Sequence, residues 1–524
     1  MGRPGFVLDV DERTPPLLLH EGEGFRLERL PLGSQVIYPP ESLPAIVDLE
    51  GAIRRALLHP HGSDPLPELL QRDMRLTIVF DDLSLPLPPM RTPDVRQRVI
   101  EQVLEMAAAA GVDDVELIAA NSLHRRMTPA ELKRTVGERV FRAFHPDHLC
   151  NHDAENPSDL AHLGTTAHGE DVEINRRAAE SDLIVYVNIT LTAMNGGSKS
   201  VAVGLASYAS LRHHHNVHTL RHSRSFNDPP HSAMHQSYDR MADVIGGHVP
   251  VFTIETTLNN EPFPASLRFL TRREWEWNLT DQASYLAVKR SNELVTGKLR
   301  HRVWQATEAP YGVTGVHAGV PSQVHPHTLA AVHRQQLTEV QGQADVAIFG
   351  LPYICPYNVN SIMNPILVMS LGLGYFFNLY RGRPIVRQGG VAIFYHPMPN
   401  EFHPVHHPSY IDFYELLAET TDPVMLETKY EKQFATDPWY IHLYRTSYAY
   451  HGVHPFYMWY WGAHAMQHLH DVIFVGGDRS TTARLGFRAA STLADALELA
   501  RETVGRDPQI SYLHAPPMVL ADVR

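Results

Sequence analysis

The sequence predicts a protein of the α/β class, with two α/β domains whose sheets are mainly parallel. Short β-branched runs alternate with amphipathic helical stretches along the chain. The same alternation recurs after residue 340, and 524 residues exceed the length that one hydrophobic core usually supports. We therefore expect two domains, with a ligand site in the cleft between them.

The predicted strands are short runs rich in valine, isoleucine and phenylalanine. They are apolar at consecutive positions, which is typical of parallel strands buried on both faces. Seven such runs occur: RLTIVF (75–80), VELIAA (115–120), DLIVYV (182–187), VPVFTI (249–254), VAIFG (346–350), VAIFY (391–395) and VIFVG (472–476).

A helix is predicted between the first two runs. Residues 93–111 place Val95, Val99 and Val103 near helical spacing, and the stretch stops at Gly111, a common residue at the end of a helix. This predicts a β-α-β unit. Further along, residues 213–236 are rich in histidine, serine and proline, which indicates a loop or an irregular insertion.

The domain limits follow from where the alternation restarts. We expect an N-terminal cofactor-binding α/β domain over residues 1–275 and a C-terminal α/β domain over residues 276–504. Residues 505–524 are a segment that can return to the first domain.

Composition excludes several classes of function. The formal net charge of −13 argues against a nucleic acid or an anionic membrane as the main partner. Two cysteines, Cys150 and Cys355, suggest neither a disulfide framework nor a cysteine zinc site. The N-terminus has no signal-peptide core, and glycines interrupt the longest apolar run, 365–380. We expect a cytoplasmic protein that acts on a small molecule.

The clearest chemical motif is NGGSKS (195–200). Gly196 and Gly197 would let the backbone approach a ligand, the amides from Ser198 onward could cradle a phosphate, and Lys199 presents an amine. The competing interpretation is a solvated lysine after an ordinary glycine turn, because such loops are frequent.

Three further blocks accompany this motif in a fixed order. The blocks are FDDLSLPLP (80–88), NSLHRRMTPAEL (121–132), NGGSKS with HHHN (213–216) after it, and LTDQASYLAVK (279–289). In these blocks together the chain resembles the lactate racemase family, whose members racemise or epimerise 2-hydroxy acids with a nickel-pincer nucleotide.

The resemblance implies how the cofactor would be held. Lys199 would bond covalently to the nucleotide beside Gly196, Gly197 and Ser198, and Asp82 would accept hydrogen bonds from its ribose. Trp439 is a weaker candidate for a tryptophan that packs near it, since aromatic core residues are commoner. Asp82 also fits an ordinary strand-end turn.

The resemblance also implies the metal ligand. His215 falls on the position that supplies a histidine to nickel, and imidazole suits nickel in a square-planar site with sulfur and carbon donors. The alternatives are a neighbour as the ligand, either His213 or His214, or a polar loop that binds no metal.

Catalytic roles fall on two blocks. His124 matches a family histidine that acts as acid or base on the substrate hydroxyl, and Thr128 with Glu131 resembles a capping box after it. Tyr285 and Lys289 are four residues apart, so they share a helix face, and the resemblance puts both at the active site with Lys289 opposite the substrate carboxylate.

The chain departs from the family at several positions. The loop 187–197 lacks the second catalytic histidine; Thr190 and Thr192 are poor proton acceptors there. Leu85 replaces an arginine that grips the substrate carboxylate, and Leu286 replaces a common glutamine. Lactate is therefore a doubtful substrate. The second base could be Thr190, Thr192, His213, His214, His218 or a water molecule.

The leading hypothesis is a racemase or epimerase that transfers hydride to and from a nickel-pincer nucleotide through a 2-keto acid. One alternative is a one-directional hydride-transfer oxidoreductase with the same cofactor, favoured by the missing histidine. Another is a non-catalytic nickel- or nucleotide-binding protein, because 33 histidines could store metal. The first two imply cofactor-biosynthesis enzymes as partners.

Overall fold

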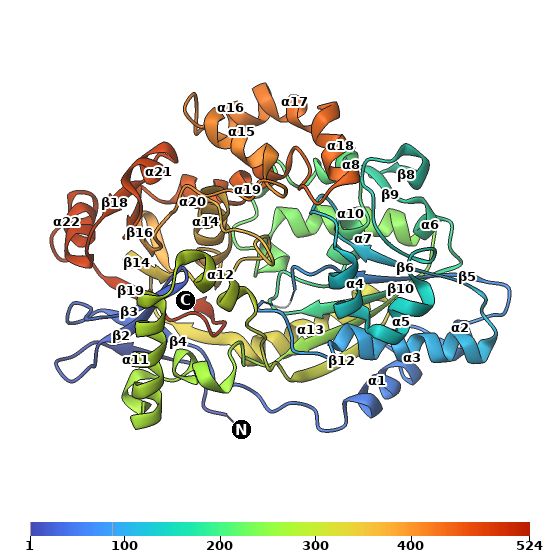
Figure 1. Ribbon diagram of the computed structural model, residues 1–524, viewed down its shortest axis with the longest axis horizontal. Coiled ribbons are helices and arrows are strands. Elements are labelled where there is room, and N and C mark those ends of the chain that lie inside the picture. Colours follow the sequence, from blue (N-terminus) through green and yellow to red (C-terminus); the bar gives the residue numbers. More distant parts are fainter. Residues whose placement is uncertain (1, 86) are drawn as a thin grey trace.

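The computed structural model describes residues 2–85 and 87–524 and confirms the α/β class (Figure 1). All seven predicted runs form strands, because their branched apolar side chains fill both faces of two large sheets. Every pairing among those seven strands is parallel.

The first sheet has six strands, and only its edge strand β12 is antiparallel to its neighbour. The carboxyl ends of its parallel strands point to one edge, where ligands bind in open α/β sheets. In spatial order the strands are β12 (Val313–Gly319), β11 (Val251–Leu258), β10 (Leu183–Thr190), β5 (Arg75–Asp81), β6 (Asp114–Ala120) and β7 (Leu149–Asn151).

The second sheet has seven strands, and only its edge strand β1 is antiparallel to its neighbour. The strands in spatial order are β1 (Phe6–Asp9), β4 (Gln35–Tyr38), β19 (Ile510–Leu513), β14 (Ala344–Gly350), β16 (Val386–Tyr395), β17 (Asp471–Val475) and β18 (Arg488–Ala490).

Strand pairing divides the chain differently from the expected limits 1–275 and 276–504. The N-terminal strands β1 and β4 complete the second sheet, because the open edge of β19 needs a hydrogen-bonding partner. Strand β12, beyond residue 275, closes the first sheet. Residues 505–524 do not rejoin the first sheet, since β19 pairs with β14, and β20 (Leu520–Val523) pairs with β13 (Leu337–Val340) and β15 (Tyr380–Gly382).

Helices cover both sheets. Helix α3 (Val95–Ala110) packs on the first sheet and ends at Gly111, which has a φ of 75°, as the sequence predicts. Other helices are α1 (Leu49–Leu58), α4 (Pro129–Val136), α7 (Lys199–Gly204), α8 (Tyr208–Leu211), α10 (Ala233–Gly246), α11 (Leu279–Leu294), α12 (Gly297–Gln305), α13 (Pro321–Gln336), α15 (Pro408–Leu416), α18 (Pro438–Thr446), α19 (His454–Trp461) and α22 (Leu493–Val504).

One structural expectation holds only in part. Residues 213–236 are largely irregular, but α9 (Val217–Arg221) and the first turn of α10 also lie within them. The side chain of Asn216 caps the first of these helices, and Val217 and Leu220 are buried beneath it. The density of polar residues hid a short helix with few apolar positions.

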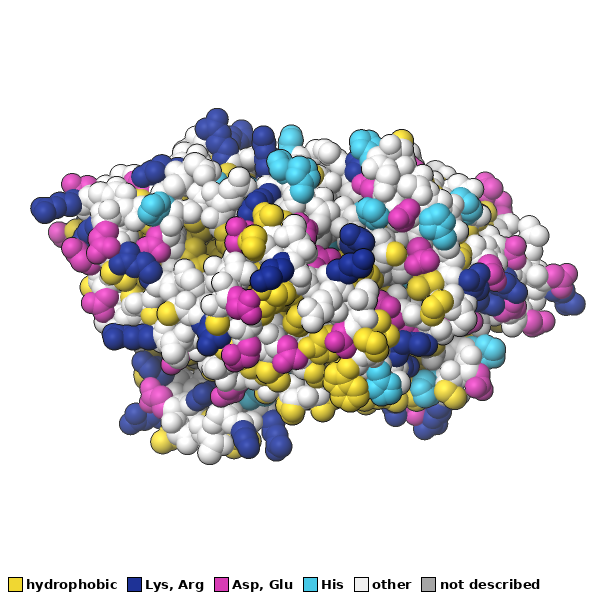
Figure 2. All heavy atoms as spheres, turned by 90° about the horizontal axis from the view of Figure 1, so that it is seen from above, with side chains coloured by type: hydrophobic (Ala, Val, Ile, Leu, Met, Phe, Trp, Pro, Cys, Tyr) yellow, Lys and Arg dark blue, Asp and Glu magenta, His cyan; other side chains and the backbone are white. Residues whose placement is uncertain are grey.

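The surface and helices have two features that bear on partners. Acidic and basic side chains are interspersed on the face shown in Figure 2, with no continuous basic band. Among the described residues, no helix is both long enough and apolar enough to cross a membrane.

Candidate functional site

Two aspartates end the central strand β5 of the first sheet. Asp81 is the last residue of the strand and accepts hydrogen bonds from the Ile189 amide at 2.7 Å and from Asn188. Burial raises the pKa of the Asp81 carboxyl to about 6, against the opposing effect of the Ile189 hydrogen bond. Asp81 thus holds the ends of β5 and β10 together, and the chain turns so that Asp82 faces His124.

Asp82 and His124 are hydrogen-bonded across two strand ends. Nδ1 of His124 lies 2.7 Å from Oδ2 of Asp82, and the Ser84 amide donates to the other carboxylate oxygen at 3.0 Å. Burial would raise the pKa of Asp82, but the charge and hydrogen bond of His124 hold it below its ordinary value. The carboxylate is therefore ionised and accepts the Nδ1 hydrogen bond of His124, which leaves Nε2 as the nitrogen that faces away from Asp82 and can exchange a proton.

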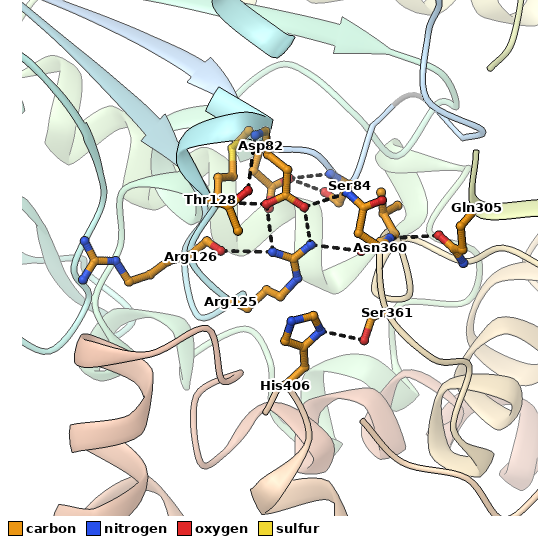
Figure 3. A network of polar contacts seen from close by, with 12 residues as sticks. Asp82, Ser84, Arg125, Arg126, Thr128, Gln305, Asn360, Ser361 and His406 are labelled. Atoms are coloured by element: carbon orange, nitrogen blue, oxygen red, sulfur yellow. Dashed lines mark hydrogen bonds and ion pairs between the residues drawn. The ribbon is translucent and has the colours of Figure 1, made fainter. Parts of the chain in front are cut away.

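The loop that carries His124 is fixed at both ends. It runs from the end of β6 to α4, and Thr128 and Glu131 form the predicted capping box at the start of α4. Arg125, almost fully buried, donates to Glu131 at 2.7 and 3.0 Å and to the Val359 carbonyl at 3.0 Å. Asn360 also donates to Glu131, so this loop contacts the second half of the chain (Figure 3).

The glycine–lysine loop lies at the end of β10. Gly196 and Gly197 have φ values of 88° and 60°, and the Gly197 amide donates to the buried Glu255 carboxylate at 2.6 Å. A Cβ at Gly197 would lie 2.8 Å from the His325 ring. Glycine is thus required here both by the backbone conformation and by the close approach of Glu255 and His325.

Lys199 begins α7 directly after this loop. Its amine forms no ion pair in the part of the chain that the structure describes, and burial lowers its pKa, with Asp81 and Asp82 acting in the opposite direction. A depressed pKa makes the neutral, nucleophilic amine more accessible.

One small cavity unites these groups. It has a volume of about 70 Å³. The lining residues that sequence predicts as functional are Asp82, His124, Gly196 and Lys199, and Leu85 lines it as well.

His215 lies between α8 and α9 and is buried. Burial, followed by the charges of Lys199 and His124, lowers its pKa to about 3, so its imidazole is neutral and can coordinate a metal. Its Nδ1 lies 2.6 Å from Nδ1 of His214. The rings of Tyr457 and Trp461 contact it, and the Tyr457 hydroxyl and Trp461 Nε1 are buried without a hydrogen-bond partner in the described chain. These unsatisfied atoms fit a polar group beside His215.

The N-terminal part of the chain is similar to proteins of known activity. Residues 24–228 match the family described as lactate racemase N-terminal domain. The lactate racemases of Thermoanaerobacterium thermosaccharolyticum and Lactiplantibacillus plantarum are 26% and 27% identical over 170 and 167 residues, which are 32% and 31% of this chain. Over this N-terminal part, the chain is similar to the lactate racemase family.

The sequence match spans only 38% and 37% of those two relatives. The fold likeness is broader: the lactate racemase apoprotein from T. thermosaccharolyticum has a TM-score of 0.62 and 17% identity, covering 97% of this chain and 100% of that one. The matched segment 24–228 includes every predicted residue of the small cavity and also His215.

Six residues that the lactate racemase resemblance assigns to the site do not line the small cavity: Gly197, Ser198, His215, Tyr285, Lys289 and Trp439. Tyr285 is buried among the rings of Phe25, Phe269 and Trp277. Lys289 follows it on the same face of α11, with Nζ 5.9 Å from the Tyr285 ring, and lines a separate cavity of about 1430 Å³.

Trp439, on α18, is 60% exposed and stacks on His442. Ser198 precedes α7 without capping it and does not line the small cavity.

The candidates for the family's second base are also absent from the cavity lining. Thr190 donates to Asn188, Thr192 donates to Asn195, and His213 lies 3.6 Å from Asp171. His214 is buried beside His215, and His218 packs on His222.

Sequence reasoning missed three groups. Glu255, within β11, fixes the glycine–lysine loop, and Arg125 fixes the His124 loop. His454, the first residue of α19, lies 5.4 Å from the His124 ring between centroids, and its Nε2 is buried without a partner in the described part of the chain. Arg125 adjoins a predicted residue and was discoverable, but nothing in the local sequence of Glu255 or His454 indicates this contact.

Among the described residues, no group of three or more histidine, cysteine, aspartate or glutamate side chains has the geometry to hold a metal ion.

Proposed function

We propose that this chain is a racemase or epimerase of a 2-hydroxy acid that uses a nickel-pincer nucleotide attached to Lys199. The observation that carries the proposal is the meeting of a carboxylate–imidazole pair, Asp82 and His124, with an unpaired lysine in one cavity. The similarity of residues 24–228 to the lactate racemase N-terminal domain supports the reaction class.

The residues fit the group by their chemistry. Lys199 supplies an amine of lowered pKa, Gly196 and Gly197 allow close approach, and neutral His215 supplies one imidazole ligand. When bound, the nucleotide would accept and return hydride.

His124 performs the proton step. Because Asp82 holds the Nδ1 proton, Nε2 takes the proton of the substrate hydroxyl as the 2-keto acid forms, and returns it when the hydroxy acid is restored. Asp82 stabilises the imidazolium in between. The proton thus moves between two named atoms, the substrate oxygen and His124 Nε2.

The substrate we propose is a 2-hydroxy acid other than lactate. Leu85 lines the cavity where the family carries an arginine, so this chain lacks a bidentate cation for the carboxylate at that position.

A second candidate function is one-directional oxidation of a 2-hydroxy acid with the same cofactor. It is favoured because none of Thr190, Thr192, His213, His214 and His218 lines the cavity. Chiral analysis of the product separates the two: an epimerase forms both configurations from either one.

The first test is the intact mass and nickel content of protein produced together with cofactor-making enzymes. We expect a nucleotide-sized adduct with bound nickel in the wild type and in Lys298→Ala, an exposed lysine of the separate cavity, and neither in Lys199→Ala. An adduct that survives Lys199→Ala would refute the attachment. No adduct in any variant, under conditions that load another family member, would favour a non-catalytic nickel- or nucleotide-binding protein.

A further inference from the structure

We propose that the chain has a second ligand site, for a tetrahedral oxyanion of the phosphate type, on the outer edge of the first sheet. The site is a cavity of about 560 Å³ between α1, β12 and α13, which lie side by side in Figure 1. It is independent of the proposed function, because it shares no lining residue with the cavity of Lys199.

Three histidines from three segments converge there. His61 follows α1, His317 lies on β12 and His327 lies on α13. The ring centroids of His61 and His327 are 4.1 Å apart, and that of His317 lies 5.7 and 5.6 Å from them. Backbone hydrogen bonds from His61 to Ala318 and from Val320 to His61 fix the first ring beside β12.

The remaining charges around the cavity are positive. Arg55 and Arg334 line it from α1 and α13, and no aspartate or glutamate is among the described residues that line it. Arg334 forms no ion pair with any described residue, and Arg55 lies 3.7 Å from an exposed Asp48. In a chain of net charge −13, this is a local concentration of basic side chains with no carboxylate among the described lining residues.

The chemistry points to an anion that accepts hydrogen bonds from several directions. Guanidinium groups and imidazoles bind oxyanions through charge-assisted hydrogen bonds. The donors come from both helices, from β12 and from the segment after α1, so they can surround a tetrahedral anion. A planar carboxylate needs only one guanidinium group, which binds both of its oxygens from one side.

Affinity should rise as the pH falls. Burial and the charge of His327 lower the pKa of His61. Burial and the charges of His327 and His61 lower the pKa of His317. Glu255, on the neighbouring β11, acts in the opposite direction on His317. The other groups that face the cavity are His59, Arg55, His327 and Arg334, none of them acidic. A bound anion favours imidazolium, so protonation and binding strengthen each other.

Sulfate is the probe, because its charge is constant across the range in which histidine titrates. Calorimetric titration of the cofactor-free full chain at low salt should show binding that tightens below pH 6.5, the ordinary histidine pKa. The double variant His327→Gln with Arg334→Gln, at two exposed positions of α13, should weaken it about tenfold or more.

The control is Arg142→Gln with His148→Gln, which removes the same groups from exposed positions outside the cavity and should bind like the wild type. Equal weakening in both double variants, or no sulfate binding in the wild type, would overturn the site. Succinate that binds as tightly as sulfate would overturn the phosphate-type assignment. Since the cofactor is absent throughout, none of these results bears on Lys199.

Discussion

At the scale of single residues, the pairing of Asp82 with His124 decides what the cavity can do. The two lie 42 residues apart and meet because β5 and β6 are parallel neighbours whose carboxyl ends coincide. A histidine alone could carry its proton on either nitrogen. The carboxylate at 2.7 Å removes that choice and leaves Nε2 basic.

Asp82→Asn should therefore lower activity of the cofactor-loaded protein by about two to four orders of magnitude, because the amide no longer fixes the tautomer or stabilises imidazolium. Initial rates of isomer formation measure this. Asp228→Asn is the control, since Asp228 also pairs with a histidine Nδ1, that of His231, at 3.0 Å. Equal losses in both variants would show that the effect is structural.

At the scale of elements, the turn after β10 combines an unusual backbone with crowding. Gly197→Ala should lower the free energy of unfolding by about 1–3 kcal/mol and prevent loading of the nucleotide, because Cβ would lie 2.8 Å from the His325 ring at a φ of 60°. Urea unfolding and intact mass measure the two effects.

Gly389→Ala is a matched comparison. Its φ is 74°, but nothing lies within 4 Å of the added Cβ, so it carries the backbone strain alone. We expect a smaller loss of stability than in Gly197→Ala and normal loading. If the two variants behave alike, the contact with His325 has no role.

The elements predicted best from sequence are those whose own composition specifies them. Continuous β-branched runs identified seven strands, and a terminal glycine identified the end of α3. Short strands such as β1 and β4 have no such signal. They pair with each other, and their place in the second sheet depends on β19, near the other end of the chain, with which β4 pairs.

The part of the site that lies at strand ends could also be predicted from sequence. Asp82, His124 and Lys199 each follow a strong strand, so they meet at one sheet edge. Spacing of four residues showed that Tyr285 and Lys289 share a helix face, but spacing does not say what that face packs against, which here is an aromatic cluster.

At the scale of the whole molecule, buried neutral histidines control the response to acid. Burial, with minor contributions from neighbours, lowers the pKa of His20, His235 and His396 to about 3 and that of His152 to about 4. In the unfolded chain these groups bind protons near their ordinary pKa of 6.5. The unfolded state therefore gains protons first as the pH falls.

Stability should thus be fully retained above pH 6.5 and decline steadily from there to about pH 4. Each such histidine contributes about 1.4 kcal/mol of lost stability per pH unit. The urea midpoint of the cofactor-free protein, followed through this window, measures the decline. A constant midpoint over the window would contradict it, as would a decline that begins only where carboxylates titrate.

The bonds of Arg125 and Asn360 have a mechanical consequence. Val359 and Asn360 belong to the segment that follows β14 of the second sheet. The Val359 carbonyl accepts a hydrogen bond from Arg125, and Asn360 donates one to Glu131, in the region that follows β6 of the first sheet. If the two sheets separate to admit a nucleotide, these hydrogen bonds carry the loop of His124 with the second sheet. The His124 imidazole then moves away from the Asp82 carboxylate. The acid–base pair would then be assembled only when the molecule closes, so that an empty, open protein holds no competent base.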